Sequence, residues 1–218
     1  MITSYLSTAY LPPIEYFAHI HKSNKVIIDT YESYKKQSYR NRCHIYSDKG
    51  LMSISIPVQK PNGNNSKTNE VVIFNAENWK KNHWKTIESA YMASPYFEYY
   101  REEIKEVFFK DFIKLVEFNS SLLSLLLEIL QIENNVSYSD KFIEPNTFSN
   151  DLRFSISPKV NSKLSLDNYI QVFNERHGFI ENLSILDLIF NMGPESVYYL
   201  DKIELNPPFS QDMQSSHD

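Results

Sequence analysis

Residues 2–28, ITSYLSTAYLPPIEYFAHIHKSNKVII, determine the fold class. The first ten residues include β-branched and aromatic types that are typical of a strand, and Pro12-Pro13 ends it. Residues 14–22 repeat apolar side chains at helical spacing, directly after a proline that suits the first turn of a helix. Residues 26–28 form a short apolar run, the pattern of a strand covered on both faces. The order strand, helix, strand predicts a βαβ unit and a parallel sheet.

The sequence after this unit predicts a hairpin and then a helical region. Two β-like runs, 43–46 and 51–57, flank the turn sequence Ser-Asp-Lys-Gly. Residues 79–132 are mostly helical in pattern, and their apolar end, 118–132, predicts a buried core helix. We therefore expect an α/β protein with a mixed, partly parallel sheet that begins with a βαβ unit, is flanked by helices and is accompanied by a β-hairpin. We expect one domain over residues 1–205 and a polar C-terminal tail over 206–218.

Composition limits the possible classes of protein. The 218 residues carry 22 Lys+Arg against 27 Asp+Glu, and this net charge of −5 argues against broad nucleic-acid binding. No basic and apolar leader begins the sequence, and no run reaches the ~20 apolar residues of a membrane span, so we expect a cytoplasmic protein. The single cysteine, Cys43, excludes an intramolecular disulfide and a cysteine-rich metal site, and we interpret it as a small buried apolar residue.

The four glycines exclude one mode of nucleotide binding. Neither G-x-G-x-x-G nor a P-loop can be written with them. His19 and His21 lie two positions apart and do not share a helical face as metal ligands would, so we predict no metal site. The sequence indicates neither a cofactor nor an oligomeric state.

The segment 34–42, YKKQSYRNR, is the first candidate site because it concentrates positive charge in an acidic protein. If residues 36–42 are extended, one face of the strand carries Lys36, Ser38, Arg40 and Arg42. The planar guanidinium group suits carboxylates and phosphates. The segment therefore predicts a site for a small anion, such as a nucleotide-sugar, a sugar phosphate or a carboxylate. The alternative is a solvated edge strand protected by its charges.

The segment 79–84 is the second candidate, because both tryptophans of the chain lie there beside His83. A histidine can act as a general base near neutral pH, and indole rings can stack on a base or a sugar. The alternative is an aromatic core helix with one hydrogen-bonded histidine.

A polar stripe on the apolar helix pattern 183–192 is the third candidate. Ser184, Asp187 and Asn191 lie at i, i+3 and i+7 and could line a pocket. The alternative is a helix start, with a capping box at Ser184 and Asp187 and with Gly193 just beyond the helix end.

These segments resemble the WbqC-like protein family. The matching stretches are 10–17, 36–43, 83–84, 90–97, 151–153, 169–173 and 182–194, and together they span nearly the whole chain. The resemblance implies a bacterial cytoplasmic protein of surface-polysaccharide (O-antigen) biosynthesis, in a family described as glycine transferases. Many relatives have Trp and Gly where this chain has Pro13 and Glu15.

From the residues and the resemblance together we expect a group transferase, aminoacyl (glycine) or sugar-related, that binds an anionic donor through the basic segment. His83 is the expected catalytic base. The expected substrate-binding residues are Tyr10, Lys36, Gln37, Tyr39, Arg40, Asn41, Arg42, Trp84, Arg153 and Asp187. The expected geometry places the basic segment and His83 around one cavity. Two alternatives remain open: a non-catalytic scaffold of a polysaccharide pathway, and a nucleotidyltransferase-like enzyme, which is an analogy of fold only.

Overall fold

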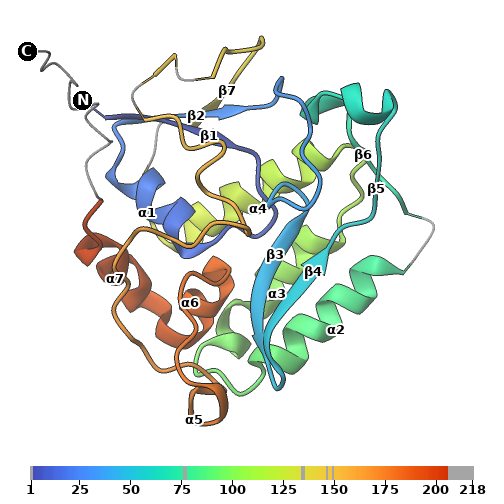
Figure 1. Cartoon of the computed structure of the whole chain (residues 1–218). Helices are drawn as coiled ribbons and strands as arrows, with labels where there is room; N and C mark the ends of the chain where they lie inside the picture. The colour runs from blue at the N-terminus through green and yellow to red at the C-terminus, as the bar shows by residue number, and fades with distance from the viewer. Residues whose placement is uncertain (1, 76–77, 134–135, 146, 149, 206–218) are drawn as a thin grey trace, which may run out of the picture.

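A computed structural model describes residues 2–75, 78–133, 136–145, 147–148 and 150–205. The predicted polar tail, 206–218, lies outside the described residues. The architecture is mixed α/β, as the sequence predicts: a parallel sheet, an antiparallel hairpin and several helices (Figure 1).

The secondary structure alternates between short strands and helices. The strands are β1 (Thr3–Ser7), β2 (Lys25–Asp29), β3 (Arg42–Ser47), β4 (Gly50–Ser55), β5 (Val58–Gln59), β6 (Val72–Ile73) and β7 (Val136–Tyr138). The α-helices are α1 (Ile14–Lys22), α2 (Trp79–Tyr91), α3 (Phe97–Phe109), α4 (Leu115–Ile129), α5 (Asn174–His177), α6 (Ile185–Met192) and α7 (Ser196–Lys202). Short 3-10 turns are η1 (Gly63–Asn65), η2 (Thr68–Glu70) and η3 (Gly193–Glu195).

The predicted βαβ unit is confirmed. Strands β1 and β2 pair in parallel, with Thr3 opposite Lys25 and Ser7 opposite Asp29, and α1 connects them. Strand β7 pairs in parallel with the other edge of β2, so β2 is the central strand. A parallel bridge from Tyr5 to Asp151 adds a further contact beside β1.

The predicted hairpin is also confirmed. Strands β3 and β4 pair antiparallel, and the two-residue turn between Ser47 and Gly50 uses the positive φ of Gly50, +91°. Such a φ is favourable for glycine because it has no Cβ. Cys43 on β3 is fully buried, which confirms the interpretation of this residue as part of the core, and burial raises the pKa of its thiol.

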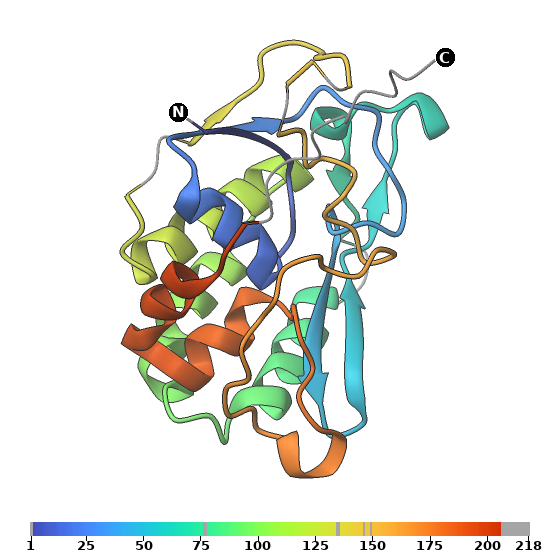
Figure 2. The same cartoon turned by 60° about the vertical axis from the view of Figure 1, so that its left-hand side comes forward.

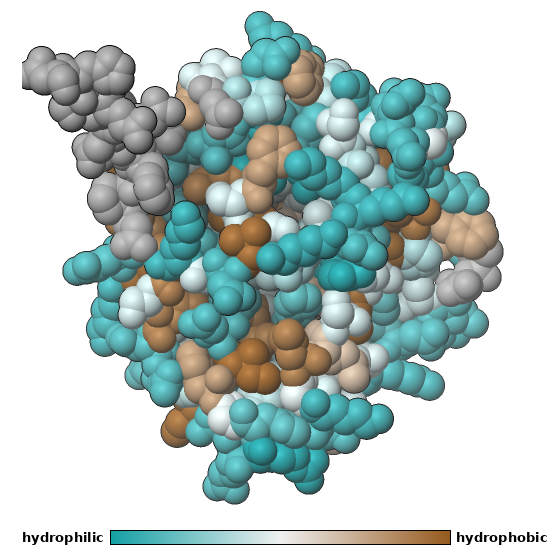
Figure 3. All heavy atoms as spheres, viewed as in Figure 1, coloured by the Kyte–Doolittle hydropathy of each residue, from teal (hydrophilic) through white to brown (hydrophobic). Residues whose placement is uncertain are grey.

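The helices pack together and against the sheet, as Figures 1 and 2 show from two directions. The predicted apolar helix is α4, which buries one side through Leu115, Phe118, Leu122 and Leu126. Its neighbour α3 packs alongside it, and α1 packs against α7. None of the helices in the described part of the chain combines the length and the apolarity that a bilayer crossing requires. On the face drawn in Figure 3, hydrophilic side chains surround smaller groups of apolar ones.

One local prediction is wrong. Residues 36–41 form turns rather than a strand, and β3 begins only at Arg42. Gln37 takes a positive φ of 55°, which reverses the chain direction and is incompatible with a continuous extended segment. The four predicted residues therefore do not share a strand face: Lys36 is exposed, whereas Ser38 and Arg40 are buried.

Candidate functional site

The carboxyl ends of β1 and β2 lie side by side because the strands are parallel and in register. The chain leaves β1 through Ser7 and Thr8, and it leaves β2 through Asp29 and Thr30, all of which are buried. Crevices at the carboxyl ends of parallel strands are the usual place for ligands in α/β proteins. Two arginine–carboxylate groups occupy this edge.

The first group is centred on Arg153, whose side chain is 1% exposed. Its guanidinium forms a two-pronged ion pair with Asp151, through Nε to Oδ1 at 2.9 Å and Nη2 to Oδ2 at 2.6 Å. Its Nη1 donates to Asp29 Oδ2 and to the Ile143 carbonyl, and Nη2 also donates to the Glu144 carbonyl. All five N–H bonds of the guanidinium are therefore used, and the carboxylates raise the pKa of Arg153. This arginine fastens the segment after residue 143 to the sheet and has no donor left for a substrate.

The second group is centred on Arg40, whose side chain is 4% exposed. Its Nε donates to Glu32 Oε1 at 2.8 Å, and Nη2 lies 2.6 Å from the same oxygen. Yet no described residue accepts a hydrogen bond from Nη2 in acceptable geometry, and Glu32 Oε2 is likewise buried without a partner. Burial raises the pKa of the Glu32 carboxyl, while the nearby Arg40 opposes that shift.

A small cavity adjoins Arg40. Its walls are Leu6, Ser7, Thr8, Ala9, Tyr16, Tyr39, Arg40, Leu152 and Ile156. The cavity volume is about 10 Å³, room for about one water molecule. Asn119 lies behind this wall and donates from Nδ2 to the Thr8 hydroxyl and to the Arg40 carbonyl, while its Oδ1 is buried without a partner among the described residues. Arg40, its ion-pair partner Glu32 and Asn119, which bonds to the Arg40 carbonyl, thus each retain one buried polar atom without a hydrogen bond to a described residue.

His83 lies on α2, away from this edge, inside an aromatic cluster. Its ring is 8% exposed and packs against Trp79, and Nδ1 is 3.0 Å from the Tyr10 hydroxyl. Burial lowers the pKa of His83 to about 4, and a hydrogen bond with the backbone of Ser55 opposes that shift. The imidazole is thus neutral at pH 7, and it already has two hydrogen-bond partners within the fold.

The expected shared cavity is not formed. His83 does not line the cavity beside Arg40, and the Arg40 guanidinium is ion-paired inside the protein rather than exposed on a strand. The physical reason is the turn at 36–41, which directs the Arg40 side chain into the protein toward Glu32 and leaves Lys36 exposed. The structure does bring Tyr10 and His83 together, and it places Tyr39 next to Tyr10 through a backbone hydrogen bond of 2.8 Å.

The remaining predicted residues lie at several places. Lys36 and Gln37 are exposed on the turn, Asn41 donates to the Ile56 carbonyl, and Arg42 donates from Nε to Ser55. Trp84 is buried, donates to Glu88 and packs against Phe108 and Phe109. The contacts of Asn41, Arg42 and Trp84 hold the hairpin and the helices together.

Asp187 forms a separate buried centre on α6. Its Oδ2 accepts hydrogen bonds from the Tyr169 hydroxyl at 2.5 Å and from Gln171 Nε2 at 2.8 Å. Burial raises the pKa of Asp187 to about 6, although those two partners and Tyr91 oppose the shift. The predicted helix start at Ser184 is confirmed, because its hydroxyl caps the Leu186 amide. Asp187 itself anchors the segment 169–171 rather than the helix end.

The carboxylates that pair with the two arginines at the carboxyl ends of β1 and β2 were not predicted from the sequence. Asp29 follows the apolar run of β2 directly, and Glu32 lies three residues further on. A carboxylate at the end of a buried strand was the available signal. Asn119 gave no comparable signal, because it is one polar residue within the apolar pattern of α4.

Comparison with known proteins supports the resemblance of the motifs. Rv1507c, an uncharacterized protein of Mycobacterium tuberculosis (strain ATCC 25618 / H37Rv), is 27% identical over 217 residues, with 88% of this chain and 94% of the relative covered. No solved structure matches the chain. The model of the WbqC-like protein family matches residues 8–170, well over half of the sequence. The chain therefore belongs to the WbqC-like protein family.

Proposed function

We propose that this protein is a group transferase whose anionic donor binds to Arg40 at the carboxyl edge of β1 and β2. The observation that carries the proposal is the Nη2 group of Arg40, which is ion-paired with Glu32 Oε1 at 2.6 Å but makes no well-directed hydrogen bond to a described residue, beside a small cavity. A buried N–H that lacks an acceptor costs free energy, and a phosphate or carboxylate oxygen would relieve that cost. The place of the reaction in cytoplasmic surface-polysaccharide biosynthesis belongs to the same proposal and rests on the family resemblance.

The donor reaches Arg40 only after part of the wall moves. The cavity holds about one water, and Leu152 and Ile156 cover it from the irregular segment that follows Asp151. Because Arg153 anchors the start of this segment and the Leu152 amide is bonded to the Tyr5 carbonyl, we expect the displacement to begin beyond residue 153 and to move Ile156 while Leu152 stays in place. The Thr8 hydroxyl, which accepts a hydrogen bond from Asn119, then faces the bound anion as a further donor, whereas the Ser7 hydroxyl already donates to the Arg153 carbonyl.

Glu32 replaces His83 as the base in this proposal. Glu32 does not line the cavity itself, but its Oε1 is ion-paired with Arg40, which does, and its Oε2 has no hydrogen-bond partner among the described residues. Burial raises the pKa of Glu32, whereas both nitrogens of His83 are engaged in the core. In the transfer, a lone pair on the acceptor's amine or hydroxyl group forms a bond to the electrophilic carbon of the donor. The bond from that carbon to the anionic leaving group breaks, and its electron pair stays on the leaving group. The acceptor's proton passes to Glu32, while Arg40 stabilises the charge of the leaving group.

Isothermal titration with nucleotide-sugars, sugar phosphates and small carboxylates tests the proposal. The variant R40M/E32Q replaces the buried ion pair by a neutral pair, so it leaves no buried charge unpaired. The matched control is R101M/E102Q, which removes an exposed ion pair from α3. We expect one ligand class to bind the wild type and the control equally and to bind R40M/E32Q at least about tenfold more weakly, a loss typical of one charged hydrogen bond.

Two results would overturn this assignment. One is a folded R40M/E32Q protein, verified by circular dichroism, that binds the same ligand with unchanged affinity. The other is the failure of the wild type to bind any of the three ligand classes at millimolar concentration.

A further inference from the structure

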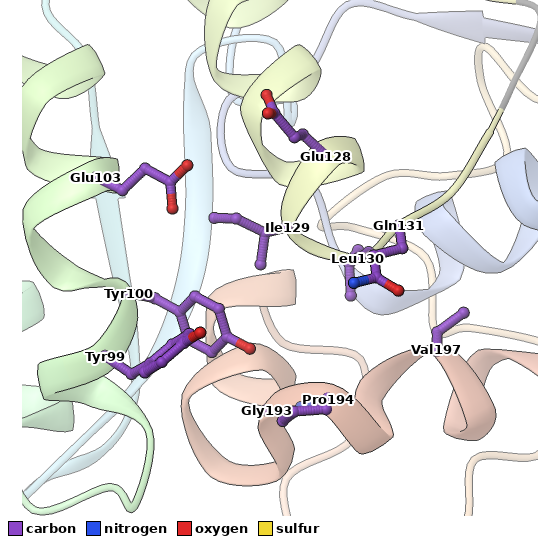
Figure 4. Close-up of a pocket in the computed structure, with 10 residues that line it drawn as sticks. All are labelled: Tyr99, Tyr100, Glu103, Glu128, Ile129, Leu130, Gln131, Gly193, Pro194 and Val197. Atoms are coloured by element: carbon purple, nitrogen blue, oxygen red, sulfur yellow. The ribbon is translucent and has the colours of Figure 1, made fainter.

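A second hollow lies on the helical side of the molecule and shares no lining residue with the cavity at Arg40. This groove has a volume of about 290 Å³ and lies between α3, the end of α4 and the segment where η3 leads into α7. Figure 4 shows Glu103 extending from α3 toward α4 and the Tyr100 hydroxyl directed toward Gly193 and Pro194. Its size is near the lower end of the range for small-molecule sites.

The charge of the groove is negative. Glu103 and Glu128 line it from two different helices, no lysine or arginine is among its lining residues, and neither carboxylate has a cationic partner among the described residues. The last turn of α4 adds to this potential, because a helix C-terminus carries partial negative charge. The Leu126, Leu127 and Glu128 carbonyls accept hydrogen bonds from later amides, whereas no backbone amide of the described residues is found to donate to the carbonyl of Ile129, a residue that lines the groove.

Two aromatic rings complete the wall. Tyr99 and Tyr100 pack edge to face, with ring centroids 4.7 Å apart and an interplanar angle of 79°. Tyr99 is 78% exposed, so its ring is available to a ligand. Tyr100 is only 7% exposed and is held in place by the residues packed around it. The face of a tyrosine ring attracts ammonium groups by a cation–π interaction.

The opposite wall is held in place by a glycine. Gly193 has a φ of +54°, and a Cβ at this position would approach the Tyr96 ring to 2.5 Å. Tyr96 in turn donates its backbone N–H to the Phe190 carbonyl at 3.0 Å, which ties the start of α3 to α6. The groove is therefore formed by packed elements rather than by a loose loop, so its ligand-binding geometry is largely preorganised.

We propose that this groove binds a small aliphatic diamine or polyamine. Two carboxylates from separate helices match two ammonium groups on one flexible chain, and the tyrosine ring and the methylene groups of the ligand provide the apolar contact. A divalent metal ion fits less well, since no group of three or more acidic, histidine or cysteine side chains in the described residues could hold one.

The test is isothermal titration of spermidine into the full chain, with 1-aminobutane and magnesium chloride as comparison ligands. Variant E103Q/E128Q removes the two groove carboxylates, and E175Q/E181Q removes two exposed carboxylates that do not line the groove. We expect one spermidine per chain, roughly tenfold weaker binding in E103Q/E128Q and unchanged binding in E175Q/E181Q, because ion pairs act at short range in salt. We expect Y99A to weaken binding by about threefold through the lost cation–π contact.

The proposal is wrong if both double variants lose affinity equally, because binding then depends on net charge alone. It is also wrong if magnesium chloride, at the same concentration as spermidine, abolishes spermidine binding completely. A wild type that shows no binding at millimolar spermidine would contradict it as well. All of these variants change surface residues that do not line the cavity at Arg40. None of these outcomes therefore tests the proposed role of Arg40.

Discussion

Arg153 and Arg40 lie buried at the same edge of the sheet but have different surroundings. Arg153 faces two carboxylates and two carbonyls, and all its N–H donors are paired. Arg40 faces one carboxylate, its Nη2 is ion-paired with it but makes no well-directed hydrogen bond to a described residue, and its side chain borders a cavity. A fully paired buried charge stabilises one arrangement of the chain, whereas a partly paired one can accept a ligand. Burial by itself therefore does not distinguish a structural arginine from a binding one. The number of guanidinium N–H groups that lack a well-directed hydrogen bond does.

The largest expected effect comes from breaking the fully paired centre. Substitution R153M leaves Asp29 and Asp151 buried without their cation, and we expect a loss of about 3–5 kcal/mol in the free energy of unfolding. Urea denaturation followed by circular dichroism measures it. The exposed Arg101→Met variant serves as the control, with an expected change of about 0.5 kcal/mol or less. A loss below about 1 kcal/mol in R153M would contradict a structural role for Arg153.

Asp187 is a buried carboxyl whose hydrogen-bond partners, Tyr169 and Gln171, are neutral, so it shows how a buried acid behaves without an arginine. The folded-state pKa of Asp187 is raised to about 6 from an ordinary value of 3.8, so the folded state binds a proton more tightly than the unfolded chain. The stabilisation from this group is complete below pH 3.8 and is lost as the pH rises through 6. We expect the unfolding free energy of the wild type relative to D187N to fall by about 2 kcal/mol between pH 4 and pH 7.

Thermal or urea unfolding of both proteins across this pH range checks the prediction. The buried histidines His19 and His83 have lowered pKa values of about 4 and act in the opposite direction, but their effect is common to both proteins and cancels in the difference. A difference that does not change with pH would mean that Asp187 titrates normally.

The smallest expected effect comes from the partly paired centre. Substitution R40M removes one cation from one carboxylate, and Glu32 can take up a proton because burial raises its pKa. We expect a loss of about 2 kcal/mol in the free energy of unfolding, less than for R153M. The double variant R40M/E32Q should recover most of this loss, which a double-mutant cycle in urea measures. A loss equal to that of R153M would erase the distinction between the two arginines.

Much of the fold was predictable, because the βαβ unit, the hairpin and the buried helix depend on local patterns. Apolar residues recur at helical spacing in α1, which begins directly after Pro13, and the sequence Ser-Asp-Lys-Gly makes the turn between β3 and β4. The prediction that Pro12 ends the first strand was wrong, because β1 already ends at Ser7. The site was predicted less well. Arg40 was found by its residue type, but its neighbours and its burial were not, since the turn at Gln37 has no strong local signal.

Local patterns were enough to predict most of the elements, the parallel pairing of β1 and β2 and the absence of a glycine-rich phosphate loop, because these follow from short-range steric and hydrophobic effects. The pairing of each arginine with its carboxylate, and the contact of His83 with Tyr10 instead of the cavity, depend on how distant segments pack. Those partners lie 8, 73 and 124 positions apart in the chain. Their pairing depends on how buried charges and donors are satisfied once the whole core has packed, and this is a property of the assembled fold.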